Sequence, residues 1–485
     1  MHVRSPLARK SRDPASPIRP TFATTRDFMD YHASERIHSV SPFGMQREIL
    51  LRAQRDTQGN PRIPCHAPVF ESMRIDGFLD TDLFSLAVRM VLEEADVLQG
   101  RLRENGGSPI LVRDTERSEP LVAVIDLTGS SGIRRKEKLG YVLTHTRSAI
   151  RDLQDGPLCS AVIARLSGSE HVLGLAFDHS VADQATLYRS FKLIGDTYGR
   201  LSAGDRESAV HVARSPGFFS HAHTTQNDGS AHEVAEATWR PAAEVKPTDF
   251  AFPGGRWKPW TERRVSVRTE RNLTNEEVNT LRDACELLGT TVTFTFLASL
   301  SLVLAGVTGG FVPVTYTRHG RQPAREPVLG PLWETVLTRD PGKPRPRLST
   351  WARQFCDDNI GSPSMNGTAL VDFVGLDQVM EGRRVALNVV QSLLPFRTEG
   401  LRWEKLRGDE VVEPGIKPPG GTAHNVGVRI VLKPDGIALA IQQDPDDLPD
   451  GSRLDAAIMR AISLMARAPD KEFGKAVEAV GREMG

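Results

Sequence analysis

The sequence is poor in cysteine, and none of its few cysteines stands in a CxxC pair. Disulfide frameworks and zinc ribbons both need closely spaced cysteines, so the sequence excludes these two classes of protein. Widely separated cysteines in a long chain predict reduced, mostly buried thiols, as in a cytosolic protein. The four cysteines are Cys65, Cys159, Cys285 and Cys356.

The sequence also lacks an excess of charge of either sign, since 61 basic residues stand against 61 acidic ones. Without a long-range field to attract phosphates, neither nucleic acid nor an anionic membrane surface is an expected partner. No apolar run approaches the roughly 18 residues that a membrane span needs. The first residues lack the apolar core of a secretory signal. These absences predict a cytoplasmic protein that binds neither membranes nor nucleic acid.

Three common motifs are missing as well: the GxSxG elbow, the GxGxxG fingerprint and the P-loop. Hydrolase, dinucleotide-binding and nucleotide-binding interpretations are therefore unsupported. A group of histidines lies in a polar stretch, but no cysteine accompanies it at the spacing of a zinc site. We expect a solvated segment there and no metal centre. These histidines are His211, His221, His223 and His232.

The organisation of the chain follows from its length and periodicity. With 485 residues, it exceeds the roughly 250–300 residues of a single core, which predicts two lobes. Strand-like and helix-like segments alternate in both halves, which is typical of an α/β fold with two similar lobes. The predicted divisions are a disordered extension at 1–35, an N-terminal lobe at 36–201, a polar linker at 202–245 and a C-terminal lobe at 246–485.

Several elements carry local signals. A helix with apolar residues near the 3.6 period follows Asp80 and Asp82, which are suited to cap its start. Thr274 and Glu277 have the spacing of a capping box for a second helix. The segment HVLGLAFDH is almost continuously apolar, as expected of a strand covered on both faces. The segment DAAIMRAISLMARA predicts a final helix that closes the fold.

The most informative stretch is LGLAFDHSVADQATL, residues 173–187. Its apolar run ends at Asp178 and His179, and Asp183 follows four residues after the histidine. An imidazole exchanges a proton near neutral pH, because its reference pKa is about 6.5. A strand end holds the backbone while the ring can face a cleft. The spacing therefore predicts one catalytic imidazole, His179, and one structural carboxylate, Asp183.

The segments around this stretch give the chain a family resemblance. SVSPFGMQREIL resembles an SPxQ-type helix motif, with Ser41, Gln46 and Arg47. DVLQGRL and the GPL of RDLQDGPLCSAVIARL are similar to two further blocks, and an HHxxxDG motif falls on residues 178–184, where His179 and Asp183 match it. In the second half, YTRHGRQPAREPVLGPLWETVLTRD looks like a GR…VGxFVNTLPLR stretch. In this order, the motifs resemble the condensation-domain superfamily of non-ribosomal peptide synthetases, which shares the chloramphenicol-acetyltransferase-like fold. The resemblance covers roughly residues 36–470.

The resemblance implies a V-shaped pair of chloramphenicol-acetyltransferase-like lobes, a pseudo-dimer with a tunnel between them. His179 would face that tunnel and deprotonate or orient an attacking amine or hydroxyl. Asp183 would pair with an arginine and hold the loop. The expected partner is Arg321, with Arg318 and Arg325 as rivals. Family membership also implies a carrier protein that acts in trans and delivers the acyl group on a phosphopantetheine arm, and no metal or organic cofactor.

Departures from the family pattern are concentrated at the site. Asp178 replaces the first motif histidine, and a carboxylate there favours the protonated form of the neighbouring imidazole. Gln184 replaces the motif glycine, so its side chain can project toward the tunnel. Glu334 and Thr335 stand where the family has Asn-Thr, so the latch between the lobes is expected to differ. Trp333 is a candidate tunnel-wall aromatic, with simple core packing as the alternative.

These observations favour a free-standing, monomeric acyltransferase of secondary metabolism, which a separate carrier protein supplies with substrate. It would form an amide or ester bond between a carrier-tethered thioester and an amine or hydroxyl nucleophile. Two alternatives remain open. One is an acyltransferase of the same fold that uses acyl-CoA, and the other is a catalytically silent scaffold that docks a carrier protein or tailoring enzyme.

Overall fold

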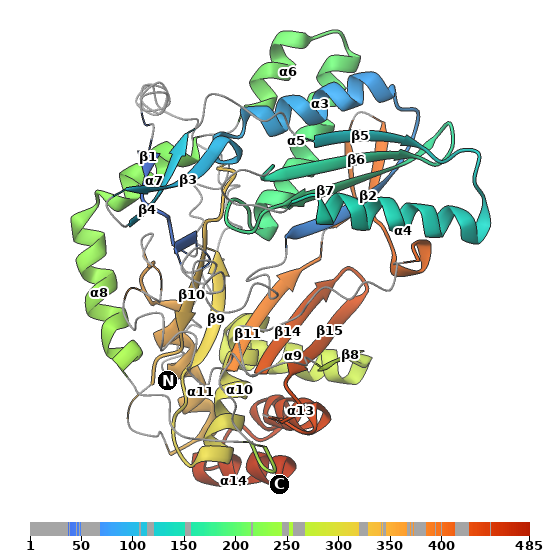
Figure 1. Ribbon diagram of the computed structural model, residues 1–485. Coiled ribbons are helices and arrows are strands. Elements are labelled where there is room, and N and C mark those ends of the chain that lie inside the picture. Colours follow the sequence, from blue (N-terminus) through green and yellow to red (C-terminus); the bar gives the residue numbers. More distant parts are fainter. Residues whose placement is uncertain are drawn as a thin grey trace, which may run out of the picture.

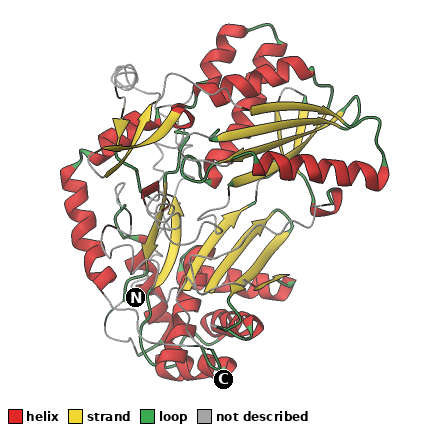
Figure 2. Cartoon of the chain, viewed as in Figure 1, coloured by secondary structure: helices red, strands yellow, loops and turns green. Residues whose placement is uncertain are grey.

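The computed structural model shows two lobes, each built around a six-stranded sheet (Figure 1). The structure describes residues 37, 39–44, 46–47, 49, 68–105, 108–113, 121–150, 157–214, 217–244, 252–255, 267–319, 328–340, 342, 346–365, 369, 372, 385–392, 394–398, 400–412, 426–446 and 448–485. Helices cover both faces of the sheet in the N-terminal lobe and one face of the sheet in the C-terminal lobe (Figure 2).

The sheet of the N-terminal lobe has the strand order β12-β13-β2-β7-β6-β5. Its strands are β12 (Phe396–Thr398), β13 (Leu401–Lys405), β2 (Val69–Asp76), β7 (Glu170–Phe177), β6 (Cys159–Arg165) and β5 (Leu121–Asp126). All neighbours are antiparallel except β5 and β6. Strand β7 lies in the interior of this sheet and its residues after Glu170 are all buried, which confirms that it is covered on both faces.

Helices pack on both faces of this sheet. The helices α3 (Thr81–Glu94) and α5 (Gln184–Ser202) cover one face, and α4 (Gly132–Ser148) covers the other. Asp80 caps α3, because its carboxylate accepts hydrogen bonds from the backbone N–H groups of Asp82 and Leu83. The predicted start of this helix is confirmed, with Asp80 as the cap and Asp82 in the first turn.

Strands β12 and β13 belong by sequence to the second half of the chain but complete the sheet of the first lobe. Trp403 of β13 is completely buried in the core of the N-terminal lobe, and its indole N–H donates to the Thr398 hydroxyl at 2.8 Å. The predicted boundary at residue 246 therefore does not divide the chain cleanly, since part of 246–485 lies in the other lobe.

The segment between the lobes is helical where the structure describes it. It contains α6 (Arg206–Ala213), α7 (Phe218–Gln226) and α8 (Gly229–Glu244). Its few aromatic residues are buried anchors, because Phe218, Phe219 and Trp239 are almost inaccessible to solvent. The described parts of 202–245 are thus packed helices, which corrects the prediction of a polar linker. Helix α7 packs beside a small sheet of β1 (Ser39–Val40), β4 (Ser108–Arg113) and β3 (Gly100–Asn105).

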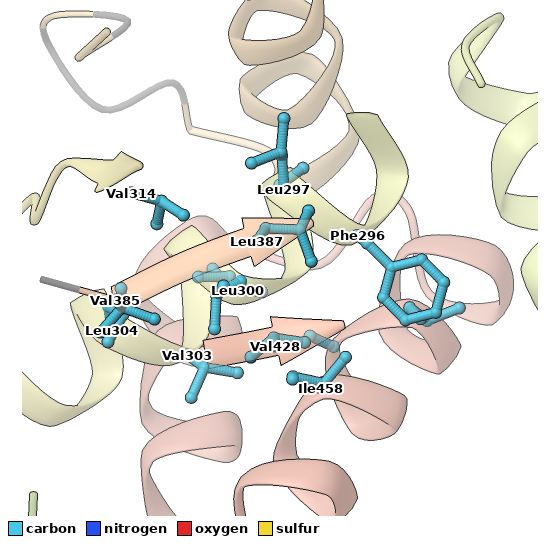
Figure 3. Close-up of a cluster of buried hydrophobic side chains, with 14 of the residues drawn as sticks. Phe296, Leu297, Leu300, Val303, Leu304, Val314, Val385, Leu387, Val428 and Ile458 are labelled. Atoms are coloured by element: carbon cyan, nitrogen blue, oxygen red, sulfur yellow. The ribbon is translucent and has the colours of Figure 1, made fainter. Parts of the chain in front are cut away.

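The sheet of the C-terminal lobe has the order β10-β9-β11-β14-β15-β8. Its strands are β10 (Trp333–Leu337), β9 (Val314–His319), β11 (Val385–Gln391), β14 (Val426–Lys433), β15 (Gly436–Gln443) and β8 (Val267–Asn272). Alternate residues of β9, β11, β14 and β15 share one core with the surrounding helices. Figure 3 shows this core, where Leu387 and Val428 lie against Phe296, Leu300 and Ile458.

The helices of this lobe are α9 (Asn275–Leu288), α10 (Val292–Thr308), α11 (Leu348–Ile360), α13 (Gly451–Arg467) and α14 (Phe473–Met484). The capping box predicted from Thr274 and Glu277 is present at the start of α9. The segment 455–468 is helical as predicted up to Arg467, the last residue of α13, but the prediction that it forms the final helix is wrong. Helix α14 follows it and packs on α10 and α13.

The described residues can be examined for disulfides, metal-ligand clusters and membrane-spanning helices. Cys159, Cys285 and Cys356 are free thiols there, and Cys65 lies outside the described residues. Among the described parts of the chain, no group of three or more potential ligands is placed to hold a metal ion. In those same parts no single helix is long and apolar enough to cross a membrane, although α9 and α10, bent by 94°, pass together on length and composition alone.

His171 gives this fold a dependence on pH. Its side chain is buried in β7, and Nδ1 has no hydrogen-bond partner within the described structure. Burial, and then the charge of Arg165, lower the pKa of His171. The unfolded chain therefore takes up a proton below about pH 6.5 that the folded chain resists, so stability falls as the pH drops through that value.

We predict that His171→Phe reduces this loss of stability in acid. The measurement is the free energy of unfolding in urea at pH 7.5 and pH 5.5. The difference between the two pH values should be smaller for His171→Phe than for the wild type. His211→Ala, which changes an exposed histidine of α6, should keep the wild-type difference. If His171→Phe loses as much unfolding free energy between pH 7.5 and pH 5.5 as the wild type, His171 is not the source of the acid sensitivity.

Candidate active site

The site forms where β7 ends and α5 begins. The N–H of Asp178 donates to the Leu158 carbonyl oxygen at 2.9 Å, and the N–H of Val181 donates to the Asp178 carbonyl oxygen at 3.1 Å. These bonds fold residues 178–183 into a tight turn at the strand end. Asp178 Oδ1 accepts hydrogen bonds from the N–H and the hydroxyl of Ser180, at 2.8 and 2.6 Å. The buried Asp178 carboxylate thus stabilises the turn.

His179 is partly buried on this turn, and Nδ1 lies 3.0 Å from the Ala182 carbonyl oxygen. Because a carbonyl oxygen can only accept, Nδ1 carries the hydrogen in this bond. In the neutral imidazole Nε2 then holds the lone pair. The turn therefore fixes both the orientation of the ring and the tautomer that can act as a base.

Asp183 caps α5 and connects the two lobes. Oδ1 accepts hydrogen bonds from the N–H and the hydroxyl of Thr186, both at 2.7 Å. Oδ2 accepts from the N–H of Leu332, in the second lobe, at 3.1 Å. Asp183 thus lies in the structural role that the spacing predicts. Its expected partner Arg321 and the rival Arg325 lie outside the described residues.

Thr186 adds a second connection between the lobes. Its hydroxyl oxygen lies 2.7 Å from the Gly330 carbonyl oxygen and accepts the N–H of Gly330 at 3.0 Å. Gly330 has φ +152°, and a Cβ there would lie 2.3 Å from Phe218 Cδ2. Glycine is therefore required at position 330, both by its backbone angle and by the phenylalanine against it.

Two motifs from distant parts of the sequence support this arrangement. Gln46, of the SPxQ-type motif, donates from Nε2 to the Ser180 carbonyl oxygen at 2.7 Å and accepts the N–H of Phe43 at 2.8 Å. Asp96, of DVLQGRL, accepts the N–H groups of Phe218 and Phe219 at 2.9 and 3.1 Å. Burial raises the pKa of Asp96, and these bonds to backbone N–H groups oppose the rise.

Trp333 covers one side of the imidazole. Its ring stacks on His179 with centroids 5.0 Å apart and an angle of 26° between the planes. The indole Nε1 is buried and makes no hydrogen bond within the described structure. Trp333 therefore lies against the candidate base, and its role as a tunnel-wall aromatic stays a prediction. Its neighbour Thr335 is buried in β10 opposite Thr317, and Gln184, partly buried, is the first residue of α5.

We predict that Trp333 acts as a positioning residue for His179. An aromatic pair is worth about 0.5–1.5 kcal/mol, or roughly 2- to 10-fold in rate if the stack is needed for orientation. Trp333→Val should lower kcat by up to about tenfold with little change in KM. Trp333→Phe should keep most of kcat, because it retains an aromatic ring, and the N–H that it removes has no partner to lose. Wild-type kcat in Trp333→Val would refute this role.

The altered latch position carries a new ion pair. Glu334 lies opposite Arg318 in the β9–β10 register, and Arg318 Nε donates to Glu334 Oε2 at 2.8 Å. Arg318 also donates to the carbonyl oxygens of Ser362 and Pro363, and Glu334 accepts the N–H of Met365 at 2.9 Å. The pair thus fastens residues 362–365 to the sheet. Arg318, a rival partner for Asp183, pairs with Glu334.

Two sheets flanked by helices, with a histidine turn held between them, define an α/β acyltransferase fold of two lobes. The condensation-domain family model matches residues 67–330, more than half of the chain. The chain belongs to the condensation-domain family. Membership implies acyltransferase-type chemistry and interaction with carrier domains and their substrates. No curated protein matches the sequence significantly.

Solved structures of this family share the fold. The first condensation domain of the calcium-dependent antibiotic synthetase has a TM-score of 0.63 at 18% identity, covering 90% of this chain and 98% of that chain. A mutant starter condensation domain of rhizomide synthetase in complex with C8-CoA has a TM-score of 0.66 at 16% identity, covering 92% and 98%. The X-domain in complex with OxyB from teicoplanin biosynthesis has 0.64 at 17%, covering 90% and 97%. The predicted fold class of two chloramphenicol-acetyltransferase-like lobes is confirmed, and the V shape with a tunnel is expected for this fold.

Proposed function

We propose that the protein joins a carrier-tethered acyl thioester to an amine or hydroxyl nucleophile, with His179 as the general base. The observation that carries this proposal is the bond between His179 Nδ1 and the Ala182 carbonyl oxygen. It leaves Nε2 as the basic nitrogen of a ring that is oriented by this hydrogen bond and stacked on Trp333 of the second lobe.

The reaction follows from this geometry. The nucleophile's nitrogen or oxygen attacks the thioester carbonyl carbon and gives its proton to His179 Nε2. The new C–N or C–O bond forms, the C–S bond breaks, and the imidazolium returns the proton to the leaving thiolate. Such a positioned acid–base group contributes typically about 10²–10⁴-fold in rate. The thioester is already activated, so no metal or organic cofactor is required for this step.

Two other functions are each favoured by one observation: an acyltransferase that uses acyl-CoA, and a catalytically silent scaffold. An acyl-CoA donor would use the same imidazole, and one solved structure of this fold is a complex with C8-CoA. A silent scaffold would account for the departures at Asp178 and Glu334. Against the scaffold, the bonds that hold the loop of His179 are all formed.

The test is product formation with matched donors. The wild-type protein is incubated with an octanoyl carrier protein, octanoyl-CoA or octanoyl-pantetheine, each with an amine and with an alcohol acceptor. Faster product from the carrier supports the proposal. Faster product from octanoyl-CoA favours the second function. Binding of the carrier without product from any acceptor, over a panel of acyl chains, would favour the scaffold.

A further inference from the structure

The C-terminal sheet has one face on the helices and a second face toward the first lobe (Figure 1). Val428 and Ile430 of β14 lie in the helix-covered core. Arg429, between them, therefore points to the opposite face. Electrostatic interactions reach Arg429 from Tyr188 of α5 and Glu71 of β2, both in the N-terminal lobe. Arg429 thus lies on the side of the sheet that faces the first lobe.

Helix α5 relates this position to the catalytic turn. Tyr188 lies one helical turn, or about 6 Å, after Gln184 and on the same side of the helix. The Tyr188 hydroxyl donates to the carbonyl oxygen of Gln391, at the end of β11, at 3.0 Å. One side of α5 therefore runs from Gln184, beside the loop of His179, to Tyr188, which lies near Arg429.

Arg429 carries a positive charge that no neighbour neutralises. Within the described structure its guanidinium makes neither a hydrogen bond nor an ion pair. The two carboxylates whose charges reach Arg429 are already paired with other basic side chains. Glu270 pairs with Arg268 at 2.6 Å, and Glu71 pairs with Lys405 at 2.6 Å. These two pairs cancel, so among the described residues the local charge is the single positive charge of Arg429.

The surroundings of Arg429 suit a small ligand. The side chain is exposed, although burial by nearby protein, and then the charge of Arg268, lower its pKa. It stays protonated at neutral pH. Gly427, two residues earlier on the same face, leaves open space, because a Cβ there would meet nothing closer than 3.8 Å. Asn388 lies beside Arg429 in the β11–β14 register and is exposed.

We propose that Arg429 and Asn388 form an oxyanion-binding subsite on the sheet face between the lobes, for a carboxylate or phosphate group of the substrate. A guanidinium binds either group through two parallel hydrogen bonds. Neighbouring strands lie about 4.8 Å apart, which places the Asn388 amide within reach of the same anion. The inference rests on the proposed function for its ligand, since either the acceptor's carboxylate or the phosphate of a pantetheine arm can supply the oxyanion.

Binding of two probe pairs tests the subsite without turnover. Calorimetry compares phosphopantetheine with pantetheine, and phenylalanine with phenylalaninamide; the members of each pair differ at the anionic group. For the wild type we expect the anionic member of one pair to bind about tenfold more tightly than its neutral partner, as for a charged hydrogen bond. The pair that shows the preference identifies the anion's source.

The variants make the assignment specific. Arg429→Gln should abolish the preference, Arg429→Lys should keep part of it, and Asn388→Ala should reduce it. Arg460→Gln removes an exposed arginine from α13, on the other side of the same sheet, and should keep the preference in full. Equal binding within both pairs in the wild type, or a preference that survives in Arg429→Gln, would overturn the proposal.

Failure of the proposed function remains distinguishable. His179→Ala should bind the anionic probe with the wild-type preference, because Arg429 is unchanged. A preference that depends on Arg429, in a protein that transfers no acyl group, would retain the subsite and refute the function. Acyl transfer by a protein that shows no preference for the anionic probes would retain the proposed function and refute the subsite.

Discussion

We expect His179→Ala to lower the rate of product formation by about 10²–10⁴-fold while the protein stays folded. The imidazole is the group whose tautomer the turn fixes, through the bond from Nδ1 to the Ala182 carbonyl oxygen. Its removal takes away the base but leaves Asp178, Ser180 and Asp183 in their hydrogen bonds. The measurement is the single-turnover rate with an acyl thioester donor, together with the thermal unfolding midpoint.

The control for this variant is His211→Ala, which changes an exposed histidine of α6 in the same lobe. Its rate should equal that of the wild type. His179→Gln should be as slow as His179→Ala, because an amide cannot take up the proton. Product at the wild-type rate in both His179 variants would remove His179 from the mechanism.

Of the variants proposed here, Asp183→Ala should lower the free energy of unfolding most, by about 3–5 kcal/mol. It should also lose most of the activity. The buried carboxylate accepts hydrogen bonds from the N–H and hydroxyl of Thr186 and from the N–H of Leu332. Alanine leaves the N–H groups of Thr186 and Leu332 without this acceptor, removes the cap of α5 and loosens the contact between the lobes. The free energy of unfolding in urea measures the loss.

Two further variants separate capping from the connection between lobes. Asp205→Ala removes the exposed cap of α6, which accepts only from Ser208 in the described structure, and should cost much less. Thr186→Val keeps Asp183 but removes the hydroxyl that lies against Gly330, and should have an intermediate effect. A loss of stability in Asp183→Ala no larger than in Asp205→Ala would show that the connection to Leu332 contributes nothing.

The parts of the fold that could be predicted from the sequence are those with a local cause. The capping box at Thr274 and the continuous apolar run of β7 are set by residues within one segment. The placement of β13 in the first lobe depends on Trp403 fitting a core formed far away in the sequence. Neither periodicity nor composition of that strand records which sheet it joins, so the sequence predicts a boundary that the structure does not have.

The site divides in the same way. The HxxxD spacing predicts a strand-end histidine and a carboxylate at the start of a helix, and the structure has both. Within the described residues, one partner that Asp183 contacts across the lobes is a backbone N–H, that of Leu332. A backbone donor leaves no signature in residue types. Gln46 was recognisable as part of a motif, but only the structure shows that its amide holds the Ser180 carbonyl oxygen.

The most direct measurement uses a reactive analogue of the donor. Bromoacetyl-pantetheine places an electrophilic carbon where the thioester should lie, and an imidazole nitrogen that reaches it displaces bromide and forms a stable C–N bond. We predict that peptide mass spectrometry finds the label on His179, and that an unreactive acyl-pantetheine suppresses it. If the exposed His145 and His211 are labelled while His179 stays unmodified, then no activated acyl group reaches the ring, and His179 is not the base of this protein.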